Sequence, residues 1–172
     1  HINNSVFIRD EALIMVDRRF LPCQQVEVMA SNYEEVAQAI ENMVVQGAGD
    51  IAIAAGYGLY LAAWEAEHNP KYGQEDARNF ILTAQQRLTN TRPTGHYLAA
   101  LLSKMVKKLE WEKTGWSSQM LLSIKASIDK QQRRSQLTGK WAGEILEDGD
   151  KVLTHCFPGA ALLYMLAWAR EQ

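Results

Sequence analysis

Cysteine is scarce in this 172-residue chain, which contains only Cys23 and Cys156. The two lie far apart and follow no metal-ligand spacing, so a reduced, cytoplasmic setting is expected rather than a disulfide scaffold. Long hydrophobic runs are absent as well. The longest apolar run, Ile51 to Trp64, is too short to span a bilayer and predicts a buried helix.

An excess of charge of either sign is also absent. The 18 basic and 20 acidic residues leave a formal net charge of −2. Nucleic acid or an anionic membrane normally demands a basic face, so neither is expected as the main partner. The hydrophobic share of 47% is ordinary for a globular protein, and the length suffices for one full domain and a little more.

The N-terminal region has the pattern of a small antiparallel meander. Two apolar clusters, Val6-Phe7-Ile8 and Leu13-Ile14-Met15-Val16, are separated by Arg9-Asp10-Glu11. Pro22 and then Val26-Glu27-Val28 follow them. Short apolar segments bounded by polar or breaking residues are typical of strands joined by turns, which predicts three strands here.

The remainder up to residue 146 is predicted to be helical. Ser31-Asn32-Tyr33-Glu34 has the pattern of a capping box at a helix start. A second helix is expected from about Asp50 to His68, and its many Ala and Gly residues predict that it is the central one. Apolar residues at helical spacing predict three further helices. The five tryptophans are expected in the core and at helix seams, namely Trp64, Trp111, Trp116, Trp141 and Trp168.

The C-terminal residues have the pattern of one strand followed by one helix. Lys151 to His155 is predicted to be a short buried strand, and Ala160 to Arg170 a helix. We therefore divide the chain into a small-sheet and helical domain, residues 1–146, and the start of a Rossmann-like α/β domain, residues 147–172. One such unit cannot bury its own faces, so the rest of that domain is expected to lie outside this chain or to come from another chain.

Three segments could carry chemistry. The glycines of Gln46-Gly47-Ala48-Gly49 leave the first amides of the next helix open to an anion. The same pattern also describes a plain helix-to-helix turn, and Asp50 could itself fill the anion position as an N-cap. Arg92 in Thr91-Arg92-Pro93-Thr94 is either a phosphate clamp or a surface arginine. Cys156 is either a reactive thiol near a helix N-terminus or a small buried side chain.

Five segments, taken together, resemble one family. They occur in the order seen in methylthioribose-1-phosphate isomerases, which belong with the ribose-1,5-bisphosphate isomerases and the regulatory subunits of translation initiation factor 2B. The resemblance covers nearly the whole chain as the family's N-terminal part. The segments are Val16-Asp17-Arg18-Arg19-Phe20-Leu21-Pro22, Met43-Val44-Val45-Gln46-Gly47-Ala48, Ile53-Ala54-Ala55-Gly56-Tyr57-Gly58, Thr91-Arg92-Pro93-Thr94 and Asp148-Gly149-Asp150-Lys151-Val152-Leu153-Thr154-His155-Cys156.

The resemblance implies an aldose–ketose isomerase that acts on a sugar 1-phosphate, with a phosphorylated pentose as substrate, no metal or organic cofactor, and a homodimeric assembly. It implies that Gln46, Gly47, Ala48 and Arg92 hold the substrate phosphate. It also implies that Cys156 and an Asp beyond the end of this chain carry the proton transfers.

Three departures from the family pattern argue against a standard substrate pocket. Gln46 stands where the family has Arg, which removes a positive charge. Gly49-Asp50 stands where the family has Pro-Ala, and Phe157-Pro158 replaces polar residues. These changes agree either with an isomerase of another substrate or with a non-catalytic, initiation-factor-2B-like regulatory or binding protein.

Overall fold

The structure, a computed structural model, describes residues 5–155 and 158–171. The described residues divide into two compact units, which are treated separately: residues 5–125, and those from Ala126 onward. The helix α5 (Trp116–Gly143) contributes its first turns to one unit and the rest to the other. No helix of the described residues is both long and apolar enough to cross a membrane.

The predicted meander is confirmed. Strands β1 (Val6–Arg9), β2 (Ala12–Val16) and β3 (Glu27–Ala30) form an antiparallel sheet in the order β1-β2-β3. Asp10 and Glu11 join the first two strands with positive φ values of 50° and 63°, the backbone twist that suits a two-residue hairpin. Every residue of β2 is buried, as expected for the central strand of a sheet covered by helices.

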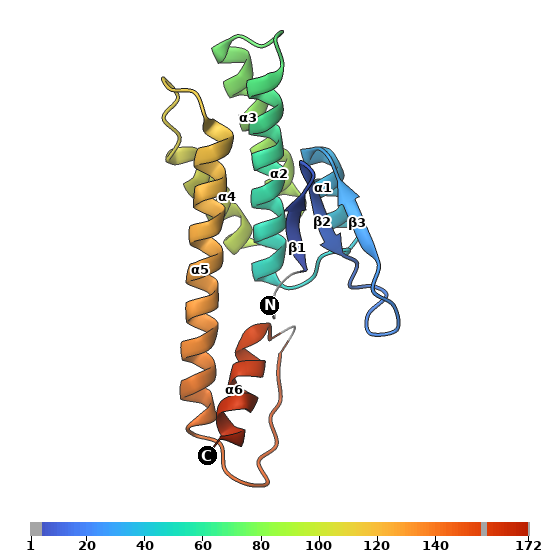
Figure 1. Cartoon of the computed structure of the whole chain (residues 1–172), viewed down its shortest axis with the longest axis vertical. Coiled ribbons are helices and arrows are strands. Elements are labelled where there is room, and N and C mark those ends of the chain that lie inside the picture. Colours follow the sequence, from blue (N-terminus) through green and yellow to red (C-terminus); the bar gives the residue numbers. More distant parts are fainter. Residues whose placement is uncertain (1–4, 156–157, 172) are drawn as a thin grey trace. The chain divides into compact units, whose positions relative to one another are not determined.

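The helices of the first unit pack around α2, as the small residues of that segment predict (Figure 1). It contacts α1, α3 and α4, and also β1 and β2. Gly58 explains how α2 can lie so close to its neighbours, because a Cβ there would come within 3.1 Å of both Val36 and Leu88 side chains. The helices are α1 (Tyr33–Glu41), α2 (Ala48–His68), α3 (Gln74–Asn90) and α4 (His96–Lys107).

The N-cap of α1 lies one residue later than predicted. Asn32, rather than Ser31, is the N-cap of α1, and its side chain accepts a hydrogen bond from the Glu35 amide at 2.9 Å. The Glu35 carboxylate in turn accepts from the Ser31 amide at 2.6 Å. The prediction failed because Ser and Asn cap equally well and Glu occupies both positions 34 and 35, so the pattern fits two registers.

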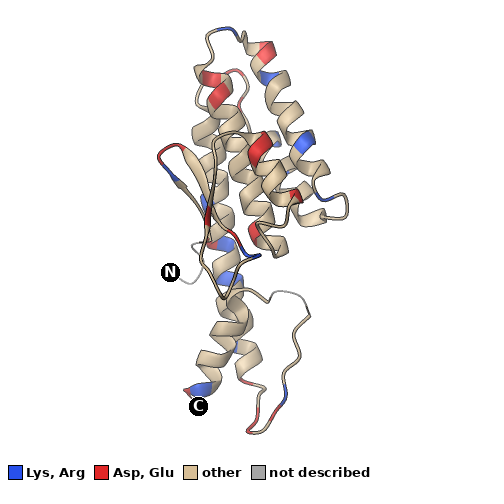
Figure 2. Ribbon diagram, turned by 90° about the vertical axis from the view of Figure 1, so that its right-hand side faces the viewer, with Lys and Arg blue, Asp and Glu red and all other residues tan. Residues whose placement is uncertain are grey.

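Ion pairs link α1 to α3. Arg87 donates to Glu34 through Nε at 2.8 Å and to Glu41 through Nη1 at 2.6 Å. These hydrogen bonds hold the pKa of both carboxyl groups below the usual value. In the view of Figure 2, acidic and basic residues are interspersed along the helices of this unit.

In the second unit, the rest of α5 packs against α6 (Ala160–Arg170) at two glycines. A Cβ on Gly139 would overlap Tyr164 and lie 2.8 Å from the Met165 amide nitrogen, and one on Gly143 would lie 2.9 Å from Trp168. The helix predicted at residues 160–170 is confirmed. Its contact with α5 depends on the absence of side chains at both glycines.

Two predictions for this unit are wrong. Residues 151–155 form no strand, and Leu153 is 97% exposed. A strand needs a hydrogen-bonding neighbour, and no described segment provides one to these residues. Trp141 is 62% exposed rather than buried. The domain boundary that the sequence suggests at residue 147 stays a prediction.

Candidate functional site

The segment from Gln46 to Ala48 forms the turn that leads into α2. Gly47 is the N-cap residue, with φ 90° and ψ 129°, a conformation that favours glycine. Because glycine has no side chain, the N-cap makes no side-chain hydrogen bond to the first amides of the helix. The Gln46 side chain folds back, and its Nε2 donates to the Met43 carbonyl at 3.3 Å.

Arg92 lies in the turn between α3 and α4. Thr91, the C-cap of α3, donates from its hydroxyl to the Leu88 carbonyl at 2.7 Å, and the Gly95 amide donates to the Arg92 carbonyl at 2.8 Å. These bonds fix the turn. The Arg92 guanidinium then reaches α1, where Nη2 donates to the Ile40 carbonyl at 3.0 Å and contacts the Met43 sulfur. Its Nε is buried without a hydrogen-bond partner among the described residues.

The fold thus brings two of the predicted segments together at Met43. This residue accepts from Gln46 through its carbonyl and contacts Arg92 through its sulfur. Its φ is 61°, which turns the chain sharply after α1 and toward the start of α2. Residues that are far apart in the sequence, 46–48 and 92, therefore share one neighbourhood within the first unit.

An ion pair that the sequence reasoning missed lies at the same end of α2. Arg18 donates from Nη2 to the Asp50 carboxylate and, at 3.0 Å, to the Ser5 hydroxyl. Ser5 in turn donates to Asp50 at 3.2 Å. Arg18 and Asp50 expose only 13% and 18% of their side chains. One sequence signal could have indicated this ion pair: a basic residue just after β2 and an acidic residue at the start of a helix that packs on that strand.

Asp50 is not the N-cap that the sequence suggested as one alternative. The helix begins two residues earlier, at Ala48, so Asp50 belongs to the first turn. A carboxylate in that turn still interacts favourably with the positive end of the helix dipole. The charges near the start of α2 include Arg18 and Asp50, which pair with each other, and Arg92 beside Met43, which also interacts with the Glu41 carboxylate.

The remaining predicted site residue, Cys156, lies outside the described residues. Cys23 is exposed and makes no disulfide. Among the described residues no group of three or more His, Cys, Asp and Glu side chains is arranged to hold a metal ion.

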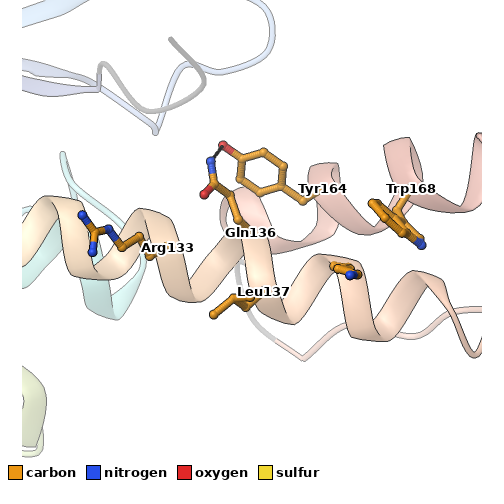
Figure 3. A pocket seen from close by; sticks show the side chains of 6 residues that line it. Arg133, Gln136, Leu137, Tyr164 and Trp168 are labelled. Carbon is orange, nitrogen blue, oxygen red and sulfur yellow. Dashed lines mark hydrogen bonds between the residues drawn. The ribbon is translucent and has the colours of Figure 1, made fainter.

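A hollow of about 490 Å³ lies between α5 and α6 in the second unit. Figure 3 shows the Gln136 amide and the Tyr164 hydroxyl pointing toward one another, joined by a hydrogen bond of 3.4 Å. The other lining residues are Arg133, Leu137, Lys140 and Trp168. Among the predicted site residues that the structure describes, none lines this hollow.

Comparison with known proteins relates both the sequence and the fold to one group. Residues 44–172 match the model of the Initiation factor 2 subunit family. The methylthioribose-1-phosphate isomerase of Thermosipho africanus is 34% identical over 155 residues, and that of Nitratidesulfovibrio vulgaris is 30% identical over 155. Each alignment covers 87% of this chain and 43% of the relative, so the chain spans less than half the length of these relatives.

Two solved structures have a similar fold. The 5-methylthioribose 1-phosphate isomerase from Pyrococcus horikoshii has a TM-score of 0.69 and 29% identity, over 84% of this chain and 41% of its own. The translation initiation factor eIF-2B subunit delta from A. fulgidus has a TM-score of 0.75 and 28% identity, over 97% of this chain and 51% of its own.

The fold and these matches define a class of mainly helical domains with a small N-terminal antiparallel sheet, present both in an isomerase and in an initiation-factor subunit. The chain belongs to the Initiation factor 2 subunit family. Its curated relatives at about 30% identity are isomerases by name.

Proposed function

We propose that this protein is an aldose–ketose isomerase of a sugar 1-phosphate, converting 5-methylthioribose 1-phosphate or a close analogue into the ketose. The observation that carries the proposal is the meeting of the Gln46–Ala48 turn and Arg92 at Met43. Helix amides and an arginine fork are the groups that bind phosphate in proteins. The isomerases among its relatives make a sugar phosphate the ligand to test first.

In the proposed site the phosphate accepts hydrogen bonds from Arg92 and from backbone amides at the start of α2. Gln46 contributes an amide where a charged residue would bind more strongly. Because these groups bind the phosphate and not the sugar ring, the ring is positioned while its reacting atoms stay accessible. Binding energy at a remote group assists catalysis in this way.

The chemistry needs two proton-handling groups. A sugar phosphorylated at C1 cannot open its ring by simple hemiacetal reversal, so an acid protonates the ring oxygen while a base removes the proton at C2. Returning a proton to C1 completes the aldose-to-ketose conversion without any net oxidation. We assign one of these roles to Cys156 and the other to an Asp outside this chain, both within hydrogen-bond reach of the substrate.

The proposal extends to the organisation of the protein. Residues 1–146 form the first domain and residues 147–172 begin a Rossmann-like domain that helps to enclose the substrate. The active protein is a cytoplasmic homodimer that uses no metal or organic cofactor. Its partner is a phosphorylated pentose, not nucleic acid or membrane.

Turnover tests the proposal. The longest natural form of the protein is incubated with 5-methylthioribose 1-phosphate and, separately, with ribose 1,5-bisphosphate, and ketose formation is followed by NMR. Cys156→Ser is expected to lower kcat at least a hundredfold, because it removes a proton-transfer group. Cys23→Ser is the matched control, since Cys23 is exposed, and its activity should equal that of the parent. Equal turnover in all three proteins would contradict the role of Cys156.

A second candidate is a non-catalytic protein that binds a sugar phosphate or nucleotide, as the resemblance to initiation factor 2B subunits suggested. The neutral Gln46 and the acidic Asp50 favour it, because both weaken a phosphate pocket. The likeness to eIF-2B subunit delta over 97% of the chain also favours it. Saturable binding of 5-methylthioribose 1-phosphate with no turnover on either sugar would support this candidate over the isomerase.

A further inference from the structure

A hollow of about 420 Å³ lies in the first unit at the C-terminal end of α2. It is lined by the end of α2, the start of α3 and the segment 112–116 that leads into α5; Figure 1 shows both connections at the same end of this unit. Because α2 has 21 residues and a helix rises about 1.5 Å per residue, the hollow lies about 30 Å along α2 from the proposed phosphate site. The two sites share no residue.

An acidic side chain, Glu67, is held in the wall of this hollow. Its carboxylate accepts hydrogen bonds from the Ser117 hydroxyl at 2.5 Å and from the Ser117 amide at 3.3 Å. Ser117 is buried in the first turn of α5, so these bonds fix the position of Glu67. Within the described part of the chain, Glu67 forms no ion pair with a basic residue. A carboxylate has about four acceptor positions, which leaves Glu67 able to accept from a ligand as well.

Trp116 provides a second polar group without a partner. Its side chain lines the hollow and is only 6% exposed, and its indole Nε1 is buried with no hydrogen-bond partner among the described residues. A buried Trp N–H usually has an acceptor, and a ligand in the hollow that carries one would supply it. The Tyr72 ring and the side chains of Ala66 and Ala77 make the rest of the lining aromatic and apolar.

The charge around the hollow is negative. Residues 66–78 and 110–117, which form the hollow and its rim, contain more acidic than basic side chains. The basic ones are Lys71, Arg78 and Lys113, and the acidic ones are Glu67, Glu75, Asp76, Glu110 and Glu112. Lys113 is exposed and pairs with Glu110, and Arg78 lies over the Trp111 ring at 5.3 Å. A negative surrounding of this kind favours a cation and disfavours an anion.

We propose that this hollow binds a small organic amine. The protonated amino group donates to Glu67, the apolar body packs against Tyr72 and Trp116, and a hydroxyl or carbonyl group of the ligand accepts from the indole N–H. Aromatic rings also attract an ammonium group through their electron-rich faces. The proposal goes beyond the isomerase and does not depend on it.

Two probes that differ in one group test the proposal on the parent protein. Tyramine carries an ammonium group, a ring and a hydroxyl; tyrosol is the same molecule with a second hydroxyl in place of the ammonium group. Binding is followed by NMR through the Trp116 indole N–H resonance, which is assigned by its absence in Trp116→Phe. Tyramine should shift this resonance with a dissociation constant of about 1 mM, and tyrosol should bind about tenfold more weakly because it lacks the charge.

Glu67→Gln keeps an oxygen acceptor for Ser117 and removes the negative charge. It should bind tyramine about tenfold more weakly and should no longer prefer tyramine to tyrosol. Glu65→Gln is the matched control, since Glu65 lies on the same helix but does not line the hollow, and its affinity for tyramine should equal that of the parent. Thermal unfolding confirms that each variant is folded.

Three outcomes would overturn the proposal. The first is no shift of the Trp116 resonance at tyramine concentrations up to about 10 mM, which corresponds to binding too weak for a specific site. The second is equal affinity of the parent for tyramine and tyrosol, which needs no variant. The third is unchanged tyramine binding in folded Glu67→Gln. None of these results involves turnover, so the isomerase and the amine site stand or fall separately.

Discussion

Asp17 is a charged side chain that exposes only 1% of its surface. Its carboxylate accepts three hydrogen bonds from Arg19, from the backbone amide at 3.0 Å, from Nε at 2.8 Å and from Nη2 at 2.5 Å. The side-chain hydrogen bonds from Arg19 are the main reason that the pKa of Asp17 lies below its usual value. Arg19 also donates to the Asn42 carbonyl at 3.3 Å, so the pair connects the end of β2 to the segment after α1.

We predict that Asp17→Asn destabilises the protein by about 1–2 kcal/mol at pH 7, because a hydrogen-bonded charged acceptor is lost from a buried position. A carboxyl group whose pKa is lower in the folded state stabilises that state above the unfolded pKa, about 3.9. That contribution is lost as the pH falls through the folded pKa. The difference in free energy of unfolding between parent and variant, measured by urea denaturation, should therefore shrink between pH 5 and pH 2.

Asp129→Asn is the control for this series, since Asp129 is exposed on α5. Its free energy of unfolding should follow that of the parent at every pH. A gap between parent and Asp17→Asn that stays constant with pH would mean that the carboxylate charge contributes nothing.

At the scale of elements, the packing of α5 on α6 in the second unit depends on close backbone approach. The atoms facing Gly139 include the Met165 amide nitrogen and the Ala161 carbonyl oxygen, which would lie 2.9 Å from a Cβ at this position. Backbone atoms cannot move aside as a flexible side chain can. Contacts below 3.0 Å to backbone atoms place the overpacking cost in the upper part of its usual range, about 2–3 kcal/mol, which outweighs the gain of about 1 kcal/mol in helix propensity from Gly to Ala.

We predict that Gly139→Ala loosens α6 and raises the hydrogen-exchange rates of its amides about five- to thirtyfold, the factor that corresponds to 1–2 kcal/mol. Thr138→Ala, an exposed change on the same turn of α5, should leave these rates unchanged. Unaltered exchange in Gly139→Ala would show that the two helices do not pack as closely as the structure has them.

The sequence predicts a helix or strand well where the local residue pattern determines it. It predicts poorly where a segment distant in the sequence must supply a partner. Alternating clusters gave the meander, and the Ala and Gly content of residues 50–68 gave the central helix, because both patterns follow from side-chain periodicity. Residues 151–155 have the composition of a strand but no partner strand among the described residues. The Arg18–Asp50 pair was missed for a similar reason: it joins residues 32 positions apart, and no periodicity reports such a contact.

At the scale of the whole molecule, the order of five short motifs identified the family before any fold was known, and the family match over residues 44–172 confirms it. The motifs could not predict how Gln46 and Arg92 relate in space. Their common neighbour is Met43, which lies between two helices and itself has a positive φ, a conformation that side-chain periodicity does not reveal. The chain spans 43% of the length of its isomerase relatives, so the second proton-transfer group of the proposed activity stays a proposal.

The central claim is that the Gln46–Ala48 turn and Arg92 form one sugar-phosphate site. Its most direct test is the dissociation constant of 5-methylthioribose 1-phosphate for the parent and for Arg92→Gln, with Arg78→Gln as a matched control on α3. Loss of a charge-assisted hydrogen bond costs about 1.5–3 kcal/mol, so Arg92→Gln should bind roughly ten- to a hundredfold more weakly, while Arg78→Gln binds like the parent. Equal affinity of the folded Arg92→Gln variant and the parent would contradict the claim.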